Sequence, residues 1–164
     1  MRMFPSHVRL GTETRHEMCQ LLNTSLAATL DLTYQVKQAH WNIKGPQFFA
    51  RHELFDKLAD RVRGFSDDIA ERVSTLGGYA RGTVRMSAEG SPLAEYDSDA
   101  VQGKAHIRTL VDRYGHLCGL LREQIGTVQK LDDVATEDLL TEVVRELELD
   151  MWFLESHLNV EPEN

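Results

Sequence analysis

Cysteine and long apolar runs, on which secreted and membrane folds depend, are nearly missing from the sequence. Two cysteines occur among 164 residues, and Cys19 and Cys118 show neither C-x-x-C nor Cys/His metal-ligand spacing. This argues against a disulfide framework or a zinc finger and predicts two buried thiols in a reducing compartment. No apolar run is long enough to cross a bilayer, and residues 1–7 lack the core of a signal peptide. We therefore expect a cytoplasmic protein with no membrane contact.

Positive charge is also scarce, with 18 Lys and Arg residues against 26 Asp and Glu residues and a formal net charge of -8. Proteins that bind nucleic acids hold phosphates through a basic surface, which supplies most of their non-specific affinity. The residues that precede the first expected helix include Arg2 and Arg9 but no lysine, and the chain ends in the acidic segment Glu161-Pro162-Glu163-Asn164. The sequence predicts weak or absent DNA binding.

Proline occurs only four times, which leaves long stretches that are free to be helical. Apolar residues recur at steps of three and four through these stretches, and the pattern predicts helices over 14–43, 47–76, 103–129 and 136–159. Thr14 begins a T-x-x-E capping box and Thr136 is the expected cap of the last helix, while Gly45-Pro46 and Gly77-Gly78 are stop signals.

Residues 78–97 show no helical period and read as a long crossover, with a short extra helix expected near 97–101. A long connection in a small bundle places its flanking helices parallel. We therefore predict an all-α, ferritin-like four-helix bundle over 14–160, with short tails at 1–13 and 161–164.

Four residues of the second expected helix have side chains that suit a metal ion, namely His52, Asp56, Asp67 and Glu71. At about 100° per residue they share one face, beside the apolar stripe of the same helix. The His/Asp and Asp/Glu pairs are centred roughly 22 Å apart at about 1.5 Å per residue, so one helix cannot bring them to one ion.

A second copy of the helix resolves this difficulty, because the residue numbers of His52 and Glu71, and of Asp56 and Asp67, both add up to 123. An antiparallel two-fold copy would set each residue opposite its counterpart and build two identical sites from two chains. His40, just before the Gly45-Pro46 turn, is a further candidate ligand. The small residues Ala59, Gly64 and Ala70 lie on or beside this face and would allow close approach.

Mixed imidazole and carboxylate ligands favour iron, manganese or zinc over magnesium or calcium. The alternative for each single pair is an ordinary solvated helix surface. Four other histidines, His7, His106, His116 and His157, have no ligand spacing and are expected on the surface or satisfied in the core.

The segment from Lys37 to Gly45 and the pattern H-x11-H-x3-D-x10-D-x3-E, which begins at His40, resemble the signature of the Dps family of mini-ferritins. The Leu76-Gly77-Gly78 ending and the Trp152-Phe153-Leu154-Glu155 segment are also similar to that family. The resemblance implies a hollow dodecamer that oxidises Fe(II) to Fe(III) with hydrogen peroxide or oxygen and stores the ferric mineral. It also implies that one chain supplies His40, His52 and Asp56 and that its neighbour supplies Asp67 and Glu71.

The resemblance further implies that Trp41 lies near the site and scavenges an oxidising equivalent, and simple packing is the alternative. Two other functions remain open: a DNA-coating shell in which the metal site is secondary, and a shell that binds zinc or manganese at the same residues without turnover. Loss of peroxide-dependent iron oxidation in His52→Ala or Glu71→Ala would distinguish the first function from both.

Negative charge is concentrated between positions 131 and 150, which contain eight acidic residues and one basic residue, Arg145. In the family that the chain resembles, this segment lines a pore through which iron enters. The candidate pore residues are Asp133, Glu137, Asp138 and Glu142, and Asp138 matches the family pattern best. The alternative is an ordinary solvated helix face.

Overall fold

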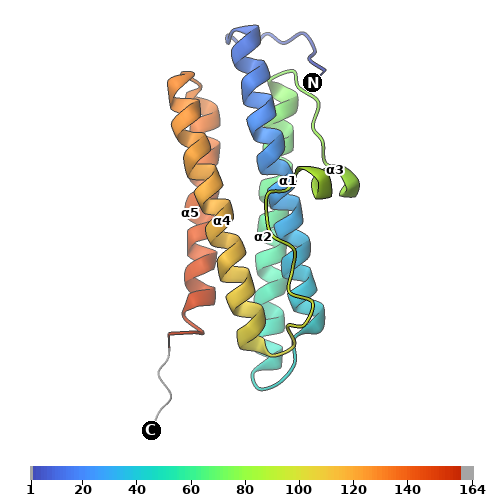
Figure 1. Ribbon diagram of the computed structural model, residues 1–164. Coiled ribbons are helices and arrows are strands. Elements are labelled where there is room, and N and C mark those ends of the chain that lie inside the picture. The colour runs from blue at the N-terminus through green and yellow to red at the C-terminus, as the bar shows by residue number, and fades with distance from the viewer. Residues whose placement is uncertain (1, 160–164) are drawn as a thin grey trace.

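The structure is a computed structural model that describes residues 2–159. Its helices are α1 (Thr12–Asn42), α2 (Phe48–Thr75), α3 (Val84–Gly90), α4 (Gly103–Lys130) and α5 (Val134–Glu155). The four long helices form a bundle in which α1 pairs with α2 and α4 pairs with α5 (Figure 1). Because the chain crosses the length of the bundle after α2, α2 and α4 run parallel, which confirms the predicted topology.

The bundle core consists of the apolar stripes that the sequence predicted. Met18, Leu22, Phe55, Val62 and Leu147 are among its fully buried side chains. Cys19 and Cys118 are buried free thiols, as expected. Among residues 2–159, no helix combines the length and the apolar character that crossing a membrane would require.

Two helices begin at residues other than the predicted caps. The N-cap of α1 is Gly11, whose carbonyl accepts from Arg15 N at 2.9 Å, so the predicted capping box at Thr14 is wrong. The N-cap of α5 is Asp133, whose carboxylate accepts from Thr136 N, so Thr136 lies within the first turn. Both helices therefore begin before the predicted position. The cap residue supplies the acceptor for an N–H group one turn later, so it lies one turn ahead of the first paired N–H group.

The crossover helix also lies elsewhere than predicted. It spans Val84–Gly90, where the hydroxyl of Thr83 accepts from Met86 N as an N-cap. The short helical turn expected near 97–101 is a hydrogen-bonded turn, closed by a 3.2 Å hydrogen bond from Ala100 N to Asp97 O. A helix as short as α3 has too few residues for a recognisable apolar period, so its cap is its main sequence signal.

The segment before α1 packs onto the end of α2 and is not a free tail. Phe4 N donates to Gly77 O at 2.6 Å, and the guanidinium of Arg15 donates to Leu76 O at 2.9 Å. Gly77 has φ of 84°, and a Cβ placed there would lie 2.5 Å from Phe4 O. Only glycine fits this position, as the predicted Gly77-Gly78 stop implied. The predicted C-terminal tail, 161–164, lies outside the described residues.

A carboxylate, Asp150 of α5, is buried inside the bundle. Its Oδ1 atom lies 2.9 Å from Nη1 of Arg61, and the same nitrogen lies 3.4 Å from Glu146. Burial raises the pKa of Asp150 to about 6, Arg61 opposes that rise, and Glu146 adds to it. The charged form of Asp150 is therefore a cost to the folded chain near neutral pH.

We expect Asp150→Asn to become more stable relative to the parent as pH rises. The parent gains stability from protonated Asp150 below the unfolded pKa of 3.8 and loses that gain as pH rises through about 6, whereas asparagine does not titrate. The difference in unfolding free energy should move by about 1–2 kcal/mol in favour of the variant between about pH 5 and about pH 8. Urea unfolding followed by circular dichroism measures it. Glu123→Gln, which changes an exposed carboxyl on α4, is the control, and equal differences at both pH values would contradict the expectation.

Candidate metal centre

His40 and His52 come together where α1 ends and α2 begins. The connection turns sharply because Gly45 has φ of 97° and Gln47 has φ of 63°. The two imidazole rings stack with centroids 3.7 Å apart. His40 Nδ1 donates to His52 O at 2.8 Å, and His52 Nδ1 donates to His40 O at 2.9 Å.

These reciprocal hydrogen bonds determine which ring nitrogen can bind a metal. A carbonyl oxygen can only accept, so each Nδ1 atom carries the proton, and the Nε2 lone pair of each neutral ring is left available. A hydrogen bond from the second ring nitrogen is the usual way in which a protein orients a metal-binding histidine. His40 and His52 are therefore preorganised as a pair of Nε2 ligands.

Asp56 lies beside this pair, one turn after His52 on α2. Its Oδ1 atom is 3.8 Å from His40 Nε2 and also contacts the ammonium group of Lys37. The hydrogen bond from Lys37 lowers the pKa of Asp56 below its ordinary value, so the carboxyl stays ionised. Sequence reasoning missed Lys37, although its position three residues before His40 places both side chains on one face of α1.

Asp67 and Glu71 lie farther along α2, and both are exposed. Eleven residues separate Asp67 from Asp56, which is roughly 16 Å along the helix at about 1.5 Å per residue. Over residues 2–159, no group of three or more His, Cys, Asp or Glu side chains that could hold a metal ion closes within the single chain. His40, His52 and Asp56 lie near one another without forming a complete metal site, and Asp67 and Glu71 lie elsewhere on α2.

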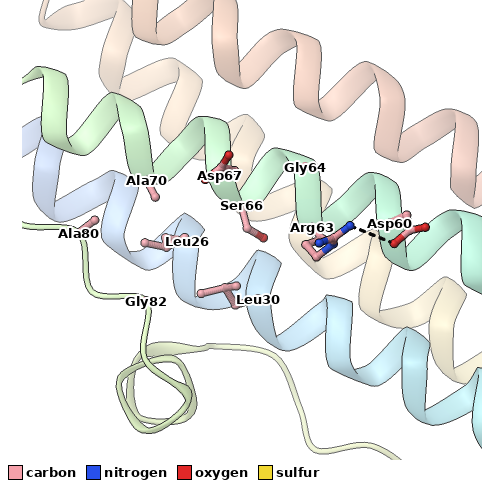
Figure 2. A pocket seen from close by; sticks show the side chains of 10 residues that line it. All are labelled: Leu26, Leu30, Asp60, Arg63, Gly64, Ser66, Asp67, Ala70, Ala80 and Gly82. Carbon is pink, nitrogen blue, oxygen red and sulfur yellow. Dashed lines mark hydrogen bonds and ion pairs between the residues drawn. The ribbon is translucent and has the colours of Figure 1, made fainter.

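Asp67 lines a hollow of about 620 Å³ between α1, α2 and the start of the crossover (Figure 2). Gly64 and Ala70 line the same hollow, and a Cβ added to Gly64 would meet no atom within 4 Å. Ala59 is 2% exposed and belongs to the core, so its expected place on the open face is wrong. Its position at the edge of the apolar stripe explains the difference.

Trp41 is 63% exposed and follows His40 at the end of α1. Its ring lies 5.9 Å from the ammonium group of Lys37, which links it to the group that holds Asp56. The phenyl ring of Phe48 lies 5.2 Å from the ring of His52 and covers one side of the pair. The indole of Trp41 is therefore both exposed and close to the candidate site.

The acidic segment is divided by burial. Asp133 is 4% exposed and holds the guanidinium of Arg72 at 2.8 Å in addition to capping α5. Asp138 and Glu142 are exposed, and Glu137 accepts from Gln129 Nε2 at 2.7 Å. Asp133 thus connects α2 to α5, and Glu137, Asp138 and Glu142 are the residues that remain as candidates for a pore lining.

Four further histidines, His7, His106, His116 and His157, follow no common pattern. His106 is fully buried against Tyr96, whose hydroxyl lies 2.5 Å from Nδ1, and burial lowers the pKa of this histidine. His116 is exposed and its Nδ1 atom hydrogen-bonds to Asp112 O at 2.8 Å. His7 is exposed and His157 is partly buried, and neither belongs to a group of three or more potential ligands in the described part of the chain.

Comparison with known proteins identifies the family to which this fold belongs. Residues 19–162 match the family model of the ferritin-like domain. The DNA protection during starvation protein of Agrobacterium fabrum is 38% identical over 149 residues, which cover 91% of this chain and 92% of the relative.

Two solved structures agree with that relationship. DpsC from Streptomyces coelicolor matches with a TM-score of 0.93 and 32% identity over 99% of this chain and 95% of its own. The tetragonal form of Mycobacterium smegmatis Dps matches with a TM-score of 0.89 and 30% identity over 100% of this chain and 97% of its own. The chain, with its helical bundle and parallel crossover, therefore belongs to the Dps family of ferritin-like proteins.

Proposed function

We propose that twelve copies of the chain form a hollow shell that oxidises Fe(II), preferably with hydrogen peroxide, and stores the ferric product inside. Each oxidation site takes His40, His52 and Asp56 from one chain and Asp67 and Glu71 from a two-fold neighbour. Iron is the substrate and the cargo, and zinc or manganese can compete for the same ligands.

The observation that carries this proposal is the stacked histidine pair, whose two Nδ1 atoms are both held by backbone carbonyls. This arrangement presents two Nε2 ligands beside one ionised carboxylate at the edge of the chain. Two nitrogens and one carboxylate leave coordination positions open. This mixed ligand set suits Fe(II) better than Mg²⁺ or Ca²⁺, which prefer oxygen ligands alone. Carboxylates from a second chain would complete the site and favour the more highly charged Fe(III) product.

Each side chain has a distinct part in the proposed reaction. Lys37 forms an ion pair with Asp56, and an arriving Fe(II) ion would displace this ammonium group. Two Fe(II) ions each give one electron to one hydrogen peroxide molecule, which takes up two protons and leaves as two water molecules. Because one peroxide molecule receives both electrons in a single two-electron reduction, release of a hydroxyl radical is avoided. The exposed indole of Trp41 would reduce a stray oxidant when only one ion is bound.

Stopped-flow measurement of Fe(II) oxidation, with peroxide and with oxygen, tests the proposal on material whose mass has been measured by sedimentation. We expect a mass about twelve times the 18.7 kDa of one chain and faster oxidation with peroxide than with oxygen. Metal binding without a change in the oxidation state of iron would instead identify a passive zinc- or manganese-binding shell.

We expect no DNA retardation in a gel-shift assay at about 150 mM salt, because the net charge of the chain is -8 and phosphate contacts weaken steeply with salt. A titration from low salt upward measures this property. Tight, stoichiometric retardation at the higher salt concentration would favour a DNA-coating shell as the main function.

Asp138→Asn is expected to slow iron entry. Asp138 is exposed near the start of α5, in the segment that carries most of the net negative charge, and a carboxylate there would attract cations toward a pore. The initial oxidation rate at limiting Fe(II) should fall about two- to fivefold, while the rate at saturating Fe(II) stays close to that of the parent. Glu123→Gln is the matched control on α4. Equal rates for Asp138→Asn and the parent at limiting Fe(II) would remove Asp138 from the proposed path.

A further inference from the structure

The open face of α2 carries an ion pair that the metal site does not use. Arg63 Nη2 lies 3.4 Å from Asp60 Oδ1, and the two side chains are 72% and 70% exposed. A long contact between two exposed side chains contributes little to the stability of a chain. The pair therefore has no evident purpose within a single molecule.

Asp60 and Arg63 border the hollow of about 620 Å³ that Asp67 also lines (Figure 2). Leu30 of α1, which is partly exposed, and Leu26, which is buried, line the hollow as well. Apolar side chains in a groove with charges at its border are typical of a protein contact surface. Because an added Cβ at Gly64 would meet no atom within 4 Å, the helix surface beside the ion pair is also open to close approach.

The numbering of the pair agrees with the register of the proposed two-fold site. In that register, residues that face each other have numbers that add up to 123, as for His52 with Glu71. Asp60 and Arg63 satisfy the same condition. At about 100° per residue, both also fall on the helix face that carries the proposed ligands. One register therefore aligns the proposed metal ligands and brings two opposite charges together.

We propose that this face of α2 binds a second copy of the chain through two reciprocal Arg63–Asp60 ion pairs, one on each side of the two-fold axis. The inference rests on the two-fold arrangement of the proposed function and adds the contact that holds it in register. The occupant of the hollow is a second copy because the charges at its border are complementary to themselves under this symmetry.

Arg63 offsets the negative charge on this face of α2. The face carries His52, Asp56, Asp60, Arg63, Gly64, Asp67 and Glu71. Arg63 is the one lysine or arginine of α2 among these residues, and Lys37 of α1 pairs with Asp56, so two such faces without Arg63 would bring mostly carboxylates together. Like charges placed opposite each other suppress association and wrong registers.

Charge reversal and charge exchange test this contact. Arg63→Asp should weaken the association of chains at least tenfold, seen by sedimentation velocity as free chains at concentrations where the parent is fully assembled. The double variant Asp60→Arg with Arg63→Asp restores opposite charges at the same positions and should reassemble. Arg108→Asp makes the same change in net charge on an exposed part of α4 and should assemble like the parent.

Full assembly of Arg63→Asp, or failure of the double variant to reassemble while its helical circular dichroism is intact, would overturn the inference. Iron oxidation by assembled His52→Ala is measured separately. If Arg63→Asp assembles normally and His52→Ala loses oxidation, the ion-pair contact alone is wrong. If His52→Ala oxidises iron at the parent rate, the proposed oxidation site is wrong whatever the assembly mass of Arg63→Asp.

Discussion

Co-assembly of two inactive variants is expected to restore about a quarter of the parent rate of iron oxidation. His52→Ala and Glu71→Ala should each lose at least about 100-fold in rate, because each variant removes a proposed ligand from every site. When one chain of each kind meets across the two-fold axis, one site carries both defects and the other carries neither. Random pairing makes half of the dimers mixed, and half of the sites in those dimers are intact.

Co-expression of the two variants with different affinity tags, followed by purification through both tags, provides the mixed shells. The matched control combines His52→Ala with Asp56→Ala, whose defects lie on the same half of the proposed site. Every site of a mixed dimer then contains one defect, and we expect no recovery. Recovery in neither mixture, in shells of normal mass, would mean that the ligands do not divide between chains as proposed.

Phe55→Ala is expected to have the largest effect on stability. Phe55 lies between His52 and Asp56 in the sequence, and its side chain is fully buried in the main core cluster. Removal of a buried phenyl ring leaves a cavity and costs about 3–5 kcal/mol of unfolding free energy. Because Phe55 lies on α2 between two proposed ligands, we also expect weaker metal binding by the variant.

Guanidinium unfolding followed by circular dichroism measures the loss of stability at a fixed protein concentration, because assembly makes the midpoint concentration-dependent. Phe49→Ala is the control, since Phe49 is 72% exposed in the chain and its truncation should cost less than about 1 kcal/mol. Similar midpoints for Phe55→Ala and the parent would show that the α1–α2 interface is not held by this residue.

The sequence was sufficient to identify the four long helices and the parallel arrangement of the second and third of them. An apolar stripe repeats every three or four residues regardless of what the helix packs against, so Phe55, Val62 and Leu147 could be assigned to the core from spacing alone. The long connection after Thr75 required α2 and α4 to be parallel, as they are. The same periodicity placed His52, Asp56, Asp67 and Glu71 on one face, because ligand positions on a helix follow from the residue count.

Helix starts depended on contacts between distant residues. Thr136 was the expected cap of α5, but Asp133 is the observed cap, and its carboxylate also holds the guanidinium of Arg72 from α2. Local sequence cannot supply such a partner. The position of α3 was missed for a related reason, since one hydroxyl cap in a short helix is a weaker signal than a period.

Within the candidate site, the chemistry of the ligands was decided by tertiary structure. The sequence by itself determined that two histidines lie near one turn and that four potential ligands share a helix face. Packing of α1 on α2 then stacked His40 on His52, tied both Nδ1 atoms to carbonyls, and brought Lys37 onto Asp56. Hydrogen bonds between two helices depend on their relative rotation and offset, and neither quantity is contained in the period of a single helix.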